Sequence, residues 1–359
     1  MKIQKLIYIT FLAILLGCTA KNSESSKEES VSVPATKTPV DTADFTNNFY
    51  DNEPTFDLKM LPLTVEGEIS NPGVVDLSKL PVHSVIVKET VLSGTGDKFT
   101  GAYRYDGYSL FDILNEFRLN KSNSEEFKPI IDLYVIVESQ NGEKAIFSWG
   151  EIYYPNHLHD ILIAKSVMRI VPSKTKDMWP LAENSKIIAA PDLITERNIE
   201  NPVKITVKSV KMTFDVNREI KMFYPKFDVF VDGKIVSTIT EKPGGAQEIT
   251  YESIFYGRGR GIHSTTPFHG TMLKEVLKNL TVRNKNNLQT GMIVVAAIDG
   301  YRTIFTYSEV FNRNDQAEAL LIYEPQNHDG GAFTLYPASD FFSDRAIKSV
   351  KSIYFDTEK

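Results

Sequence analysis

Apolar and polar residues follow nearly the same pattern in two distant stretches of the chain. Residues 134–152 and 292–310 each begin with a Val- and Ile-rich run, turn at Asn-Gly or Asp-Gly, continue through a second apolar run, and reach a Glu followed by an aliphatic residue. Asn-Gly and Asp-Gly supply the positive φ angles of a tight hairpin turn, and Val, Ile and Phe suit paired strands. The pattern predicts a β-hairpin in each stretch.

A second pair of matching blocks lies upstream of these hairpins. Residues 106–114 and 269–277 each place a glycine before a segment in which Leu and Ile or Val recur at helical spacing. This spacing predicts a short amphipathic helix after a glycine turn.

A third pair of blocks lies downstream, at residues 192–199 and 340–347. Asp192 and Arg197 recur as Asp340 and Arg345 at the same spacing, and each block precedes an apolar, strand-like segment. Because the pair recurs, we expect a structural role, such as an ion pair that locks the last loop against the closing strand.

Three blocks in the same order indicate an internal duplication. The boundaries predict one module over residues 61–212 and a second over residues 223–357. Many short strands with one or two helices in each module predict an α+β, β-rich fold.

The N-terminus has the pattern of a lipoprotein export signal. Lys2 and Lys5 precede an apolar run over residues 6–17, which is too short for the roughly 20 residues of a membrane span. The run ends in Leu-Leu-Gly before Cys18, which predicts a signal peptide over residues 1–17 and acylation of the cysteine sulfur. Residues 18–58 are mostly polar and predict a lipidated, disordered tether. We therefore expect an envelope protein, periplasmic or surface-exposed, that is anchored to a bacterial membrane by its lipid.

Composition narrows the chemistry. The formal net charge is −6, which argues against nucleic acid as a partner. Cys18 is the one cysteine of the sequence. Once it is acylated, no thiol remains for a disulfide, a nucleophile or a metal ligand.

The order of the blocks resembles the molybdopterin-binding domain of the sulfite oxidase family. The resemblance rests on residues 65–73 with 77–81, on the helix at 108–114, on the hairpin at 137–147, and on Asp-Gly-Tyr at 299–301. It implies two tandem modules with the molybdopterin-binding fold, and molybdopterin as the cofactor that such a fold carries.

The sequence departs from the family at the metal ligand. Family enzymes hold molybdenum partly through a cysteine in the loop before the glycine–helix block, and the matching stretches 91–96 and 254–261 contain no cysteine. Thiolate is the soft ligand of such a centre. We therefore expect a non-catalytic protein without bound cofactor. The alternative is a molybdopterin-dependent oxidoreductase with a non-cysteine ligand.

The most suggestive binding segment is glycine-rich. Glycines at 257, 259 and 261 let backbone N–H groups converge on an anion, and Arg258 and Arg260 are placed to clamp a phosphate or carboxylate. By the resemblance, this loop faces the pterin, and His263 and His269 follow it. We expect these four side chains to bind a small anionic ligand or an envelope protein partner. The alternative is a solvated loop.

His157 and His159 are the remaining metal candidates. In an extended segment both side chains lie on one face, which is half of a zinc site. No further ligand motif completes it, so the sequence predicts a polar turn before the strand at 161–163 and no metal site.

Overall fold

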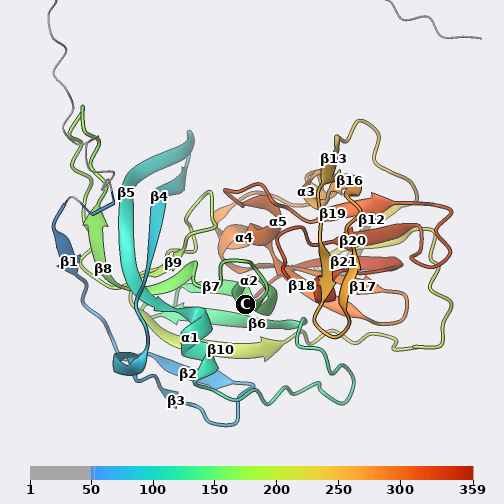
Figure 1. Cartoon of the computed structure of the whole chain (residues 1–359), viewed down its shortest axis with the longest axis horizontal. Helices are drawn as coiled ribbons and strands as arrows, with labels where there is room; N and C mark the ends of the chain where they lie inside the picture. The colour runs from blue at the N-terminus through green and yellow to red at the C-terminus, as the bar shows by residue number, and fades with distance from the viewer. Residues whose placement is uncertain (1–49, 52, 359) are drawn as a thin grey trace, which may run out of the picture. The chain divides into compact units, whose positions relative to one another are not determined.

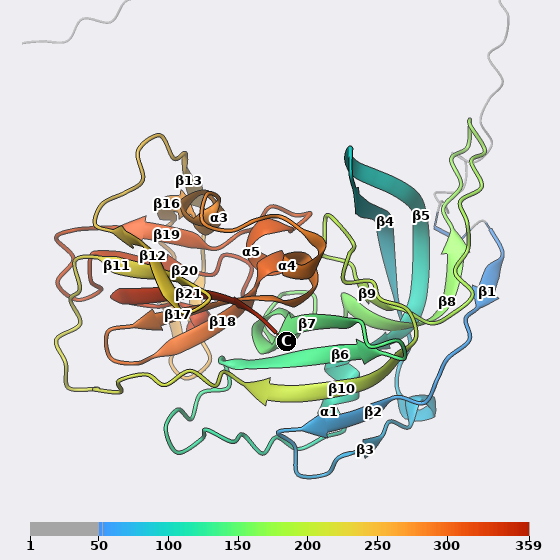
Figure 2. The ribbon, with the colours of Figure 1, turned by 180° about the vertical axis from the view of Figure 1, so that it is seen from behind.

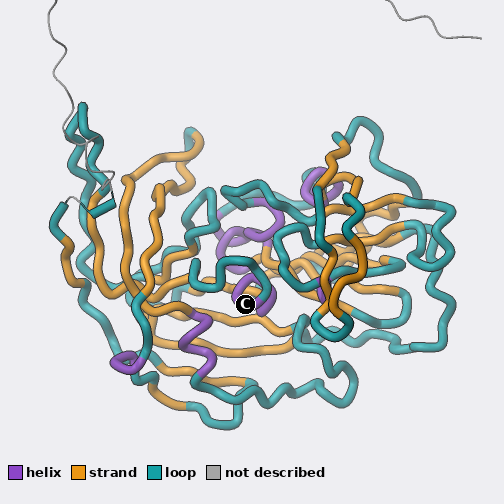
Figure 3. Tube along the Cα trace, viewed as in Figure 1, coloured by secondary structure: helices purple, strands orange, loops and turns teal. Residues whose placement is uncertain are grey.

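The computed structural model describes residues 50–51 and 53–358. The expected signal peptide (1–17), Cys18 and most of the expected tether (18–58) lie outside the described residues. The described part consists mainly of strands, and its α-helices are five or six residues long. Figure 3 shows these helices as short segments between the strands. The predicted β-rich α+β class is confirmed. No helix in the described ranges is long and apolar enough to cross a membrane.

The first half of the described chain forms two sheets. Their strands are β1 (Thr55–Asp57), β2 (Thr64–Gly67), β3 (Gly73–Val74), β4 (His83–Ser93), β5 (Gly96–Ser109), β6 (Leu133–Ser139), β7 (Lys144–Ser148), β8 (Ile161–Arg169), β9 (Ile187–Ala189) and β10 (Pro202–Ser209). One sheet has the order β1-β8-β5-β4, with β9 also paired to β8, and the other has the order β3-β2-β10-β6-β7. Helix α1 (Leu110–Asn115) follows β5, α2 (Trp149–Tyr153) follows β7, and the 3₁₀ turn η2 (Leu77–Lys79) precedes β4.

The second half contains the remaining strands. They are β11 (Phe227–Val231), β12 (Lys234–Ile239), β13 (Glu248–Tyr251), β14 (Phe255–Gly257), β15 (Gly261–Ser264), β16 (Phe268–Met272), β17 (Gly291–Ala297), β18 (Arg302–Thr306), β19 (Leu320–Tyr323), β20 (Phe333–Tyr336) and β21 (Val350–Thr357). They form the sheets β12-β11-β21-β17-β18 and β13-β16-β19-β20, and the hairpin β14-β15. The helices are α3 (Leu273–Leu277), α4 (Lys285–Thr290) and α5 (Tyr307–Phe311), with a 3₁₀ turn η3 (Ser343–Arg345).

The two halves share strand order and direction. The sheets β3-β2-β10-β6-β7 and β12-β11-β21-β17-β18 correspond strand by strand. The central strand β10 is parallel to β2 and antiparallel to β6, and the central strand β21 is likewise parallel to β11 and antiparallel to β17. The strands β4-β5-β8-β9 and β13-β16-β19-β20 are antiparallel throughout. Figures 1 and 2 show the first half in blue to yellow-green and the second in yellow to red.

The repeated sequence blocks occupy matching places in this scheme. The two expected hairpins are β6–β7 and β17–β18, and their turn glycines, Gly142 and Gly300, both have a φ of 86°. The helices after them begin at capping boxes, Ser148 with Glu151 and Thr306 with Glu309. A capping box satisfies two orphan N–H groups at once, so it fixes where each helix begins.

Alternation along the hairpin strands gives each sheet two apolar faces. Val135 and Val137 point into the core of the first half, whereas Ile136, between them, points the other way. Ile136 joins a cluster that includes Val294 and Ile304 of the second half. The five-stranded sheets of the two halves therefore meet through equivalent side chains, and β7 contacts β18.

Candidate functional site

Arg197 is almost fully buried, with 1% of its surface exposed. Its Nε and Nη2 donate to the two carboxylate oxygens of Asp192 at 2.8 and 2.6 Å. Its Nη1 donates to Glu151 Oε1 and to the carbonyl oxygen of Ile146, both at 3.0 Å. Arg345 repeats this arrangement in the second half, with Asp340, Glu309 and the carbonyl of residue 304 as acceptors. The expected ion pairs are present.

Each arginine also reaches the other half of the chain. Nη1 of Arg197 lies 3.3 Å from Thr306 Oγ1, and Nη1 of Arg345 lies 3.2 Å from Ser148 Oγ. The arginines therefore hold more than their own closing loops: each ties its loop to the helix cap of the other half.

In the buried cluster around Arg197 and Arg345, acidic side chains outnumber the guanidinium groups. Asp192 and Glu151 share one guanidinium in the first half, and the second half has the same ratio. Burial is the main cause that raises the pKa of Glu151, to about 8, and Arg197 opposes the shift. Because this cluster is closed to solvent, its role is structural.

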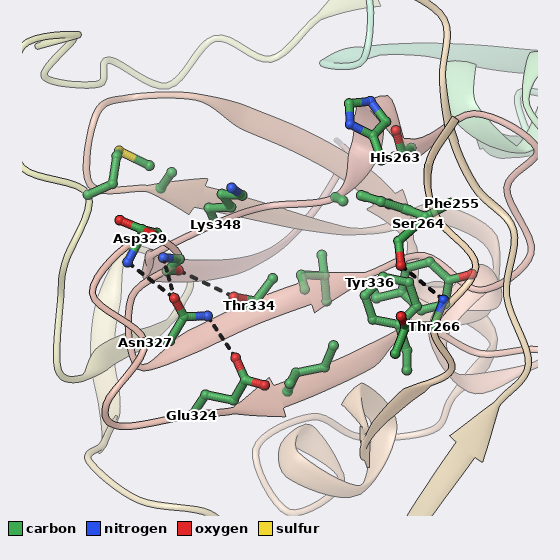
Figure 4. Close-up of a pocket in the computed structure, with 18 of the residues that line it drawn as sticks. Phe255, His263, Ser264, Thr266, Glu324, Asn327, Asp329, Thr334, Tyr336 and Lys348 are labelled. Atoms are coloured by element: carbon green, nitrogen blue, oxygen red, sulfur yellow. Dashed lines mark hydrogen bonds between the residues drawn. The ribbon is translucent and has the colours of Figure 1, made fainter. Parts of the chain in front are cut away.

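A pocket of about 820 Å³ lies in the second half. Phe255, His263, Ser264, Thr266 and Tyr336 stand at one end of it, and Glu324, Asn327 and Asp329 at the other, with Thr334 and Lys348 nearer the acidic end (Figure 4). The pocket therefore combines an aromatic end with a polar end.

The aromatic end is a packed set of rings. Phe268 and Tyr336 are stacked with ring centroids 3.9 Å apart, and Phe255 meets both edge-on. The His263 ring lies 5.5 Å from Phe255. A Cβ at position 257 would come within 2.5 Å of His263 Nε2, so Gly257 is required for the imidazole to lie here. This end offers a flat apolar surface beside an imidazole.

The polar end is held by one side-chain amide. Asn327 Nδ2 donates to Glu324 Oε2 at 2.7 Å, and Asn327 Oδ1 accepts from the backbone N–H groups of Asp329 and Gly330 at 3.2 and 2.8 Å. Asn327 thereby fixes the turn that carries Asp329. This end presents carboxylates to the pocket.

The basic side chains of the pocket have few partners of their own. In the described part of the chain, Arg260, His263 and Lys348 form no hydrogen bond or ion pair. His269 also lines the pocket, but its Nδ1 lies 2.8 Å from Thr250 Oγ1 and its Nε2 lies 3.4 Å from a carboxylate oxygen of Glu248. Three basic groups therefore remain available to a ligand.

The structure does not place all four expected residues together. Arg260, His263 and His269 line the pocket, whereas Arg258 does not. The backbone N–H of Arg258 donates to Asp344 Oδ2 at 3.3 Å, and its Nε lies 3.6 Å from Oδ1. The expected anion at this turn is therefore a carboxylate of the chain itself. The segment is not an open glycine loop but the hairpin β14–β15, with Gly261 at a φ of 73°.

Sequence reasoning missed Lys348 and the aromatic end. Lys348 follows the buried Ile347, and alternation of buried and exposed side chains along an extended segment indicates that Lys348 is exposed. The neighbouring sequence does not indicate which part of the chain it faces. Phe255 and Phe268 flank the predicted loop and were the available signal for its apolar wall.

The donor set does not fit molybdenum held through a thiolate. None of the described residues is a cysteine, and the one sulfur that lines the pocket is the thioether of Met222. Residues 91–96, the other matching stretch, lie at the turn between β4 and β5.

Comparison with known proteins gives no independent assignment. No family model matches the chain, and no curated protein matches it.

Proposed function

We propose that this chain is a lipid-anchored binding protein of the cell envelope, whose second half holds a small molecule with an anionic group. One observation carries this proposal: Arg260, His263 and Lys348 line one pocket, and their side chains form no hydrogen bond or ion pair with the described residues. The charges of Arg260 and Lys348 attract a phosphate or carboxylate, arginine can bind either in bidentate fashion, and an imidazole N–H can donate a further hydrogen bond.

The two ends of the pocket narrow the ligand class. The stacked rings of Phe268 and Tyr336 suit a flat ring, since aromatic side chains pack well against planar groups. Asp329 and Glu324 at the opposite end suit N–H donors. The ligand class that fits both ends is a nitrogen-bearing aromatic ring with an anionic substituent.

The proposal includes the resemblance to the molybdopterin-binding domain. The common strand order of the two halves supports a duplicated module, and the family resemblance assigns the module type. The missing thiolate supports binding without redox chemistry. Stoichiometric molybdenum in the purified protein, measured by elemental analysis, would overturn this part.

Calorimetric titration with guanosine monophosphate, and with inorganic phosphate alone, tests the pocket. We expect Arg260→Ala and Lys348→Ala each to weaken nucleotide binding by about tenfold or more, because each removes a charge-assisted contact. Arg258→Ala is the matched control, because its side chain belongs to the same hairpin and lies outside the pocket lining. No binding of either probe, or an equal loss in the control, would refute the assignment.

The anchor is tested separately. Metabolic labelling with a clickable fatty acid should label the wild-type chain in bacterial cells, and Cys18→Ala should abolish the label and release the protein from membranes. Labelling that persists in Cys18→Ala would contradict a lipid on this residue.

A further inference from the structure

A second group of polar side chains lies in the first half, and none of its members lines the pocket. His83 begins β4, Asp112 lies in the first turn of α1, and His159 lies in the turn before β8. One ligand atom from each residue lies within 4.8 Å of the other two. Three elements far apart in the sequence thus bring two imidazoles and a carboxylate together.

The two rings present their nitrogens to the same carboxylate. His83 Nε2 lies 2.8 Å from Asp112 Oδ2, and His159 Nδ1 lies 3.4 Å from that atom. The rings are stacked, with centroids 3.8 Å apart and planes 4° from parallel. One nitrogen of each ring therefore faces the same carboxylate oxygen, and together the three side chains offer one donor atom each to a cation.

Neighbouring side chains fix the carboxylate and one ring. Ser109 is buried, its Oγ donates to Asp112 Oδ2 at 2.5 Å, and it accepts the backbone N–H of Asp112 at 3.1 Å. The ring of Phe111 meets His159 edge-on at 5.4 Å. Such outer contacts orient metal ligands in proteins and raise affinity for the ion.

We propose that His83, Asp112 and His159 form a binding site for a divalent transition-metal ion of the zinc class. Two imidazoles and one carboxylate are the donors that zinc takes from proteins, at about 2.0–2.2 Å from each ligand atom. Tetrahedral ligands at that radius stand about 3.4 Å apart. The His159–Asp112 distance already matches this spacing. Binding would open the His83–Asp112 contact by about half an ångström and rotate the two partly exposed imidazoles out of their parallel stack, so that one nitrogen of each faces the ion.

The site has an open side. The side chains of His83 and His159 are 25% and 37% exposed, so a fourth position faces solvent. Three protein ligands with one open position are the arrangement in which zinc binds water or another small ligand.

The cluster is not a requirement of the fold. By strand register, Gly107 pairs with His83 in the first half, and the matching Gly270 pairs with Ile249 in the second. The last residue of β5 pairs with Leu162, and His159 lies three residues before Leu162. In the second half the last residue of β16 pairs with Leu320, and the residue three positions before it is Ala317. The second half keeps the strands and replaces both imidazoles with apolar side chains. The two imidazoles are therefore particular to the first half, which does not contain the pocket.

Cobalt and zinc titrations of the chelator-treated full chain test the site. Co²⁺ should bind one-to-one with visible d–d absorption, and zinc should displace it. His83→Gln and His159→Gln should each weaken binding more than about 100-fold, since ligand loss exceeds the 10–100-fold cost of losing an outer partner. His157→Gln, an exposed histidine in the same turn, should leave the affinity unchanged.

Three results would overturn the proposal. They are no stoichiometric binding of either ion to the wild-type chain, unchanged affinity in both His83→Gln and His159→Gln, and an equal loss in His157→Gln. Far-UV circular dichroism and the melting temperature without metal establish that each variant is folded. Asp112 is left intact because it contributes to the start of α1.

Discussion

Replacing Arg197 with methionine tests the buried cluster most directly. The change removes both bonds to Asp192, the bond to Glu151 and the contact with Thr306 across the halves. It leaves the Asp192 carboxylate and the Glu151 side chain buried without their guanidinium. Removing one partner of a buried ion pair costs about 3–5 kcal/mol, because the remaining charge is neither solvated nor paired. We expect a loss of that size in the free energy of unfolding.

Urea denaturation followed by tryptophan fluorescence measures the loss. With a slope near 3 kcal/mol per molar urea, a loss of about 4 kcal/mol lowers the midpoint by about 1.3 M. Arg283→Met is the matched control, because Arg283 pairs with Asp97 at 2.8 Å and both side chains are 40% or more exposed. Such surface pairs contribute about 0–1 kcal/mol. If Arg197→Met lowers the midpoint no more than Arg283→Met does, the cluster does not stabilise the fold as argued.

Two further predictions concern the same framework. The pKa of Glu151 rises from 4.5 in the unfolded chain to about 8 in the folded state, so the folded state keeps a proton that the unfolded chain loses in this window. The free energy of unfolding should therefore fall as pH rises from 4.5 to 8, by up to about 1.4 kcal/mol per pH unit. Urea titration at several pH values measures this profile, and Glu151→Gln should flatten it. A variant profile as steep as that of the wild-type chain would contradict a buried, protonated Glu151. Gly67 has a φ of 93°, and a Cβ there would overlap the carbonyl oxygen of Val207, so Gly67→Ala should cost at least about 2 kcal/mol by thermal melting. Gly73→Ala, with no atom within 4 Å of the added carbon, is its control, and equal melting temperatures for the two variants would refute the argument.

The local parts of the fold were predictable from the sequence. The β6–β7 and β17–β18 hairpins and the helices α1 and α3 depend on adjacent residues, and they occur where the patterns placed them. Sheet order depends on pairing between distant strands. Nothing in the sequence around β10 indicates a parallel partner at β2, more than a hundred residues upstream.

The glycine-rich segment shows how a local reading fails. Glycines at 257, 259 and 261 predicted a loop with converging N–H groups. The residues on either side instead pair as strands β14 and β15, with Tyr256 opposite Ile262, and Phe255 packs against Phe268 and Tyr336. Tertiary packing therefore overrode the glycine signal.

The sites combine residues that no spacing rule joins. His83 lies 29 residues before Asp112, and both lie far from His159 in the sequence. The sequence around His159 therefore did not indicate that these two residues supply the other ligands. Lys348 reaches the pocket from the segment between η3 and β21, far from the predicted loop. Only strand pairing brings these groups together.

The matching apolar faces of the two halves have a consequence for any fragment of the chain. A polypeptide that ends near residue 222 would expose Ile136 and Ile146 to water and leave Ser148 without the guanidinium that reaches it. The apolar face that this fragment exposes is similar to the face of the missing second half, where Val294 and Ile304 occupy the equivalent positions. Two copies of such a fragment should therefore associate as a dimer, in which Arg197 of each copy would contact Ser148 of the other.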